Sequence, residues 1–137
     1  MFQTVFLNLS NHPAANWPPA QRAEAEALGG QIVDEPFPAV PPDADPEDVA
    51  ALGDCTLQRI LARAPVAAMV QGEFTLTVYL VQALEFRGIL CYAATTRRIV
   101  ENAVVTAGAV EKRSRFEFVR FRRYPTATPP AQPSPAP

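Results

Sequence analysis

The sequence predicts an α/β domain of the Rossmann-like type, in which helices flank a mainly parallel sheet and a C-terminal antiparallel hairpin follows. The first observation is that short apolar runs alternate with longer segments rich in helix-forming residues. The runs lie at residues 4–9, 31–34, 66–70 and 89–93, and the helical segments at 20–28, 46–63 and 74–87. The second is that the run at 66–70 lacks polar alternation, as do strands covered on both faces. This order of elements produces a parallel sheet with right-handed crossovers.

Residue types at the ends of the helical segments support this assignment. Gly29–Gly30 can end the first helix, and Asp45 with Pro46 supplies an N-cap and a first-turn proline for the second. The segment 74–87 is ambiguous, because its first half alternates as a strand would. Its length and the glycine at position 88 favour a helix.

Length and composition place the chain among single-domain proteins. The 137 residues have room for one hydrophobic core, and we assign residues 1–124 to it. Residues 125–137 are mostly proline, alanine, threonine and serine and are predicted to form a disordered tail. No apolar run reaches the roughly 20 residues that span a bilayer, and the start lacks the basic residues of a secretory signal. We therefore expect a cytoplasmic protein with no membrane partner.

The two cysteines, Cys55 and Cys91, lack the close spacing of a metal clip. We expect both to behave as small buried apolar side chains, without a disulfide. The sequence thus predicts no metal site and no cofactor.

Charge is divided unequally along the chain. Residues 1–68 carry three basic and nine acidic side chains, whereas residues 69–137 carry nine and five. The second half can attract an anion, but the net charge of −2 argues against binding of duplex DNA. A small phosphorylated ligand fits these counts better.

Three polar loops are predicted to follow strands, at residues 10–13, 71–75 and 94–98. Ligands of parallel sheets bind beyond the carboxyl ends of the strands, so these loops form the candidate site. The candidate catalytic residues are His12, Ser10 and Arg97. The candidate ligand-binding residues are Asn11, Gln71, Gly72, Glu73, Phe74, Thr75, Thr95, Thr96 and Arg98.

The first two loops suggest different chemistry. His12 is the one histidine of the chain and lies beside Ser10 and Asn11, where an imidazole could move a proton near neutral pH. A structural or surface role is the alternative. In the second loop, Gly72 would let the backbone approach a ligand, and the helix N-terminus behind it would offer N–H groups to phosphate. The alternative is a plain tight turn, and Glu73 argues against a phosphate directly over its own side chain.

The third loop combines the hydroxyls of Thr95 and Thr96 with the guanidiniums of Arg97 and Arg98. This composition suits the binding of phosphate oxygens. The alternative is a solvated basic loop that pairs with the acidic half of the protein. Trp17 leaves a similar choice, because its indole could stack on a base or pack at a helix entrance.

A basic run near the C-terminus is interleaved with phenylalanines. The segment 99–124 alternates with period two and predicts an antiparallel hairpin that turns around Ala107–Gly108. Its arginines and phenylalanines could form a platform for single-stranded nucleic acid. Phenylalanines on the buried face and arginines on the wet face of an edge strand explain the same pattern without a ligand.

The segments Leu7–Pro13, Val70–Thr75, Ala94–Arg97 and Phe118–Tyr124 together resemble the small stand-alone CRISPR-associated proteins with a CARF-like fold that accompany type III systems. The resemblance covers nearly all of the chain except the tail. It implies a homodimer that binds cyclic oligoadenylate, the second messenger of type III CRISPR immunity, across its two-fold axis. Some members cleave the ring and so end the antiviral response. In these ring nucleases a ribose 2′-hydroxyl attacks the adjacent phosphate without a metal and leaves a 2′,3′-cyclic phosphate.

The resemblance also implies roles for single residues. It places Ser10 at the polar position that contacts the ring after the first strand, and Arg97 or Arg98 at the basic position after the fourth. The same comparison places Gln71, Gly72 and Thr75 in the turn after the third strand. The role of His12 as general acid or base is a hypothesis from its chemistry.

We therefore expect a ring nuclease for cyclic oligoadenylate, above all for cyclic tetra-adenylate. Because the family pattern assigns catalysis to positioning and charge stabilisation, loops and arginines could suffice. A non-catalytic module that binds the same ligand is the first alternative. An accessory protein that contacts RNA through the basic hairpin is the second.

Overall fold

The computed structural model describes residues 3–106 and 108–127. In these residues, five strands form one sheet in the order β2-β1-β3-β4-β5. The strands are β1 (Val5–Ser10), β2 (Gln31–Pro36), β3 (Ala67–Val70), β4 (Leu90–Thr106) and β5 (Ala109–Arg123). Neighbouring strands from β2 to β4 pair in parallel, and β5 pairs antiparallel with β4. The predicted fold class is confirmed.

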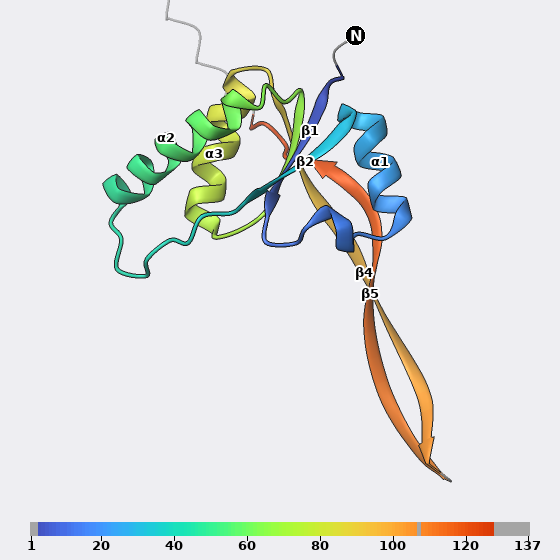
Figure 1. Cartoon of the computed structure of the whole chain (residues 1–137). Helices are drawn as coiled ribbons and strands as arrows, with labels where there is room; N and C mark the ends of the chain where they lie inside the picture. The colour runs from blue at the N-terminus through green and yellow to red at the C-terminus, as the bar shows by residue number, and fades with distance from the viewer. Residues whose placement is uncertain (1–2, 107, 128–137) are drawn as a thin grey trace, which may run out of the picture.

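Three helices cover the two faces of this sheet (Figure 1). They are α1 (Pro19–Gly29), α2 (Pro46–Ala62) and α3 (Phe74–Phe86), and a short 3₁₀ turn η1 (Ala14–Asn16) precedes α1. Helix α1 packs on one face, while α2 and α3 lie together on the other. Each helix begins and ends within a residue of the predicted bounds, and the ambiguous segment at 74–87 is helical.

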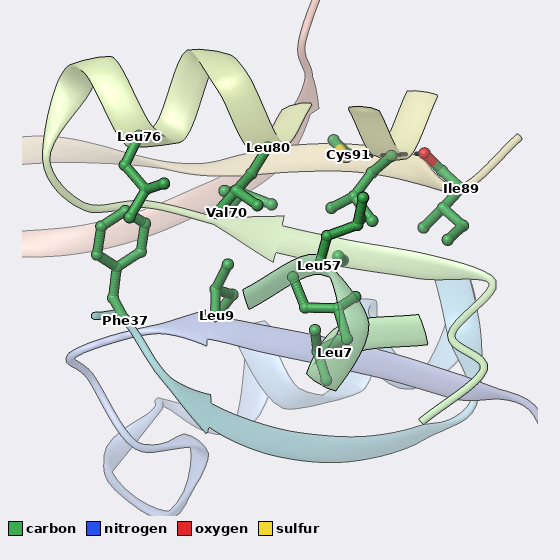
Figure 2. Packing of buried hydrophobic residues seen from close by; sticks show 12 residues of the cluster. Leu7, Leu9, Phe37, Leu57, Val70, Leu76, Leu80, Ile89 and Cys91 are labelled. Carbon is green, nitrogen blue, oxygen red and sulfur yellow. Dashed lines mark hydrogen bonds between the residues drawn. The ribbon is translucent and has the colours of Figure 1, made fainter. Parts of the chain in front are cut away.

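The alternation of side chains along the strands divides the core into two clusters. On β1, Leu7 and Leu9 are fully buried against α2 and α3, in the cluster that Figure 2 shows. Phe6 points to the opposite face, where it packs with Phe121 and residues from α1. Because the central strands are buried on both faces, their sequences are continuous apolar runs.

Local side-chain chemistry fixes the start of α2. The Asp45 carboxylate accepts a hydrogen bond from the Asp48 backbone N at 2.8 Å, and the Asp48 carboxylate accepts one from the Asp45 N at 3.2 Å. This capping box satisfies donors that a helix N-terminus leaves open. Gly53, inside the same helix, leaves room for the Tyr79 ring, since a Cβ there would clash with that ring.

The expected polar loop at 94–98 is wrong. Strand β4 continues to Thr106 and pairs with β5 over nearly its whole length, so residues 94–98 are extended backbone inside a strand. The β-branched residues at 95, 96, 99 and 100 favour strand, and the antiparallel partner takes up the backbone hydrogen bonds that a loop would have left open. The hairpin turn falls between Thr106 and Ala109, as predicted, with Gly108 at a φ of 83°.

The outer part of this hairpin, residues 97–106 and 108–117, extends away from the body of the protein, and we call it the arm (Figure 1). The expectation that phenylalanines line a buried face holds for Phe121, which is 1% exposed. It is wrong for Phe116, which is 69% exposed, because no described part of the chain covers the arm. Phe118, between them, is half-buried.

Two other expectations concern the chain end and the cysteines. Most of the predicted tail, residues 128–137, lies outside the described residues. The described part of the tail, residues 125–127, lines a hollow beside α3. Cys91 is buried as expected, but Cys55 is exposed on α2. None of the helices in the described ranges is long and apolar enough to cross a membrane.

The two thiols should react very differently. Burial raises the pKa of the Cys91 thiol to about 12, so this group stays protonated and covered at neutral pH. We expect a disulfide reagent such as Ellman's to label one thiol per native chain, at Cys55, and two in denaturant. A Cys55→Ser variant should then show no fast native reaction. Two fast-reacting thiols in the native wild type would contradict the described packing.

Candidate functional site

The strand order creates a crevice beyond the carboxyl ends of β1 and β3. These strands are neighbours, but the chain leaves β1 toward α1 on one face and leaves β3 toward α3 on the other (Figure 1). The two loops therefore diverge, and open α/β sheets bind ligands at such a crossover. Asn11 and His12 follow β1, and Gln71 and Gly72 follow β3.

Two adjoining pockets occupy this crevice. One, of about 390 Å³, opens on the side of α3 and is called here the α3-side pocket. The other, of about 440 Å³, opens on the side of α1 and is called the α1-side pocket. Asn11, His12 and Gln71 line both of them. The three side chains therefore form the boundary between the pockets.

The shared residues present polar atoms without protein partners. Within residues 3–106 and 108–127, no hydrogen bond is formed by the Asn11 amide or the His12 imidazole, and both side chains are exposed. The Oε1 atom of Gln71 accepts from the Ala94 backbone N, which leaves its Nε2 as a donor at the pocket boundary. The crevice thus offers two amides and one imidazole to a ligand.

A buried network holds the His12 loop in place. Asn8 is 1% exposed, and its Nδ2 donates to the His12 carbonyl at 2.9 Å and to the Asp34 carboxylate at 2.9 Å. The Ser10 hydroxyl donates to Asn8 Oδ1 at 2.7 Å and accepts from the His12 N at 3.1 Å. Ser10 is itself buried and lines neither pocket, so the structure gives it a role in holding the loop. The sequence reasoning did not identify Asn8 as part of the site. A single amide side chain within an apolar strand was a sign that it needs buried hydrogen-bond partners.

The Trp17 indole completes this support. Its Nε1 donates to the His12 carbonyl at 3.1 Å, and its ring packs 5.9 Å from that of Phe121. With 7% of the residue exposed, the indole is mainly a packing element, and its small exposed part lines the α1-side pocket. The alternative that Trp17 packs at the helix entrance is therefore correct.

Removing the Asn8 side chain should loosen this loop. We expect Asn8→Ala to lower the free energy of unfolding by about 1–3 kcal/mol, because it leaves buried partners in the network unsatisfied. Urea denaturation measures the change. Asn16→Ala is the matched control, because Asn16 is exposed and its side chain forms no hydrogen bond in the described residues. An Asn8→Ala protein as stable as Asn16→Ala would show that the network contributes nothing.

The loop after β3 differs from the expectation of a phosphate-binding helix N-terminus. The Glu73 carboxylate accepts from the backbone N of Thr75 at 2.9 Å and of Leu76 at 2.8 Å. These hydrogen bonds lower the pKa of Glu73 and keep it ionised. The donors expected to face a phosphate are thus used by the protein's own carboxylate. The glycine at 72 has a packing reason as well, since a Cβ there would clash with the Phe37 ring.

The remaining candidates lie on β4. Thr96 lines the α1-side pocket, whereas Thr95 donates to the Arg120 carbonyl at 3.0 Å. Arg98 donates to the Ser114 hydroxyl at 2.9 Å, and Arg97 lies opposite Glu117 in the hairpin. Neither arginine lines either pocket. The cations therefore stand at the base of the arm, next to the crevice and not inside it.

Other residues missed by the sequence reasoning line the α3-side pocket. Thr77 and Ala93 reach it from α3 and β4, and Tyr124 reaches it from just beyond β5. The Tyr124 hydroxyl donates to the Val70 carbonyl at 2.6 Å, and burial raises its pKa. No local sequence pattern predicts that these residues share a pocket, because they come from three separate parts of the chain. The described ranges contain no group of three or more His, Cys, Asp or Glu side chains that could hold a metal ion.

These features define an open α/β protein with two adjoining pockets and polar side chains at their common boundary. The chain belongs to the family described as the Uncharacterized protein MJ1673 family, whose model matches residues 4–122. That range includes the three helices, the strands except for the last residue of β5, and all the residues that line the two pockets except Tyr124. Comparisons with curated proteins and with solved structures gave no match.

Proposed function

We propose that this protein binds cyclic oligoadenylate, with cyclic tetra-adenylate as the expected ring, and cleaves it without metal to linear products that end in 2′,3′-cyclic phosphates. It would thereby switch off type III CRISPR signalling in the cytoplasm. The observation that carries the proposal is the pair of pockets with Asn11, His12 and Gln71 at their common boundary. The resemblance of the surrounding segments to CARF-like proteins supplies the ligand class.

Two pockets on either side of a polar boundary suit a phosphodiester. Each phosphodiester joins two nucleotides, so one nucleotide can lie in each pocket while the phosphate between them lies over the shared residues. The Asn11 amide and Gln71 Nε2 are donors that can hold phosphate oxygens without charge. Donors fixed in this way stabilise the negative charge that develops in the transition state.

His12 supplies the proton chemistry in this proposal. Its imidazole takes the proton of the ribose 2′-hydroxyl as the 2′-oxygen bonds to phosphorus. The bond from phosphorus to the 5′-oxygen breaks, and that oxygen takes a proton from solvent water and leaves as a hydroxyl. The products are one 2′,3′-cyclic phosphate end and one 5′-hydroxyl end. Such a reaction depends on alignment, which the Asn8 and Ser10 network would maintain.

The proposal includes a homodimer. No lysine or arginine in the described part of the chain lines either pocket, whereas a ring of four nucleotides carries four phosphates. Arg97 and Arg98 follow Thr96 directly in sequence, and Thr96 lines the α1-side pocket. Two copies around one ring would supply two such arginine pairs, and charge-assisted contacts to phosphate are the stronger ones.

A second candidate function rests on the arm. Arg98, Lys112 and the exposed Phe116 lie on it, together with three further arginines and three glutamates. Two ion pairs, Arg113 with Glu111 and Arg115 with Glu101, join some of these charges. An exposed ring among cations is the composition of a single-stranded RNA platform. This function predicts salt-sensitive binding of linear RNA and no preference for a ring.

The deciding experiment incubates the purified protein with radiolabelled cyclic tetra-adenylate in EDTA and reads both a gel shift and the separated products. The proposal predicts a shift and linear product with a cyclic-phosphate end. A shift without product would reject catalysis and leave a sequestering module. If the protein gives no shift and no product with the ring but binds linear RNA, the result would favour the RNA-binding function of the arm.

A further inference from the structure

One of the residues that line the α3-side pocket, Thr77, has a buried hydroxyl without a partner among the described residues. Thr77 is 7% exposed and lines this pocket, and its Oγ1 forms no hydrogen bond with any described residue. Thr56 on α2 shows the usual arrangement, because its hydroxyl is buried but donates to the Leu52 carbonyl at 2.7 Å. Buried polar groups are nearly always paired in native proteins, so an unpaired one calls for an explanation.

The other pocket walls are apolar or aromatic. Phe74 lines the α3-side pocket and is 87% exposed, which is unusual for a ring at the start of a helix packed on a sheet. The Tyr124 hydroxyl is already bonded to the Val70 carbonyl, so only the ring of this tyrosine is available to contact a ligand. Gly72 and Ala93 add no functional group. The pocket therefore combines aromatic surface, one unpaired hydroxyl and the amides at its boundary.

We propose that the α3-side pocket is a nucleobase subsite, in which a purine stacks on Phe74 and its edge hydrogen-bonds to Thr77 Oγ1. This inference rests on the proposed function, where the base is an adenine of the ring. A planar heterocycle has the face that an aromatic side chain stacks on. Its edge carries both acceptors and a donor, and a threonine hydroxyl can serve either. A phosphate fits the interior of this pocket poorly, because no lysine or arginine of the described residues lines it.

Two variant pairs test the subsite through binding of cyclic tetra-adenylate. Thr77→Val keeps the shape of the side chain and removes the hydroxyl, and we expect it to weaken binding about five- to tenfold. Its melting temperature should not fall, because the lost hydroxyl has no partner in the protein. Thr56→Val, the matched control, should lower the melting temperature and leave binding unchanged. A merely structural Thr77 would leave binding unchanged as well.

The second pair compares two exposed phenylalanines on the same helix. Phe74→Leu should weaken binding about tenfold, because base stacking is lost. Phe86 is 90% exposed and does not line the α3-side pocket, so Phe86→Leu should have no effect. Equal affinities for Phe74→Leu, Thr77→Val and the wild type would overturn the subsite while leaving the proposed function standing.

Adenosine serves as a separate probe that contains a base but no phosphodiester. In NMR titrations of the full chain, the subsite predicts shifts of the Thr77 methyl and Phe74 ring signals with adenosine, and none in the Phe86 ring. If adenosine causes these shifts but the protein does not bind cyclic tetra-adenylate, the subsite is upheld and the proposed function is rejected. If adenosine at millimolar levels shifts neither signal, the subsite is rejected.

Discussion

Replacing His12 by alanine is expected to lower the single-turnover rate of ring cleavage by about 10²–10⁴-fold, the usual range for loss of a general acid or base. The imidazole lies between the two pockets and forms no hydrogen bond with the described residues, so it is free to act on a ligand. Folding should be unaffected for the same reason. Because neutral amides and surrounding surface remain, affinity for the ring should change little. Rapid-quench assays with enzyme in excess measure the rate.

Gln58→Ala is the control for this prediction. Gln58 is exposed on α2 and lines neither pocket, so its removal should leave the rate nearly unchanged. If His12→Ala cleaves as fast as the wild type in single turnover, His12 has no role in proton transfer. If it loses binding and cleavage together, His12 is a binding residue.

Replacing Phe121 by alanine should produce the largest loss of stability, about 3–5 kcal/mol in the free energy of unfolding. Phe121 is 1% exposed, and its ring centroid lies 5.2 Å from those of Phe6 and Phe118. Trp17 and Tyr92 pack around it at 5.9 and 6.4 Å. The ring thus joins the base of the arm to the α1 face, and its removal should leave a cavity at that junction.

Phe116→Ala is the matched comparison, because Phe116 lies five residues earlier on the same strand and is 69% exposed. We expect this change to alter the free energy of unfolding by less than about 0.5 kcal/mol. Urea denaturation of both variants gives the difference. Similar losses for the two would mean that Phe121 does not anchor the hairpin as described.

Much of the fold could be predicted because its signals are local. Asp45 with Pro46, and Gly29 with Gly30, mark helix ends by their own backbone chemistry, and the structure has helix ends at those places. The apolar run at 66–70 indicated burial on both faces, and β3 is fully buried. The order of these elements then led to the sheet and to the edge where the crevice lies.

The length of β4 could not be predicted in the same way. Residues 94–98 are polar and follow an apolar run, which is the local pattern of a loop. They are strand because β5 returns from Ala109 to pair with them, and this partner lies far along the chain. The exposed Phe116 has the same origin, since an alternating pattern shows two faces but not what covers either of them.

The candidate site was only partly accessible to sequence reasoning. Asn11, His12 and Gln71 were expected at the carboxyl edge, and the structure brings them together. Arg97 and Arg98 were expected beside them but stand at the base of the arm. Thr77 and Tyr124 were missed, because their place in the pocket depends on packing between elements distant in sequence.

The central claim is that the ligand binds at the shared boundary of the two pockets, and side-chain amide NMR tests it directly. The full-length His12→Ala variant, labelled with ¹⁵N, is titrated with cyclic tetra-adenylate so that slow cleavage does not interfere. The account predicts large shifts of the Asn11 and Gln71 side-chain amides and no shift of the Asn102 amide on the arm. Shifts at Asn102, with Asn11 and Gln71 unmoved, would contradict it and place binding on the arm.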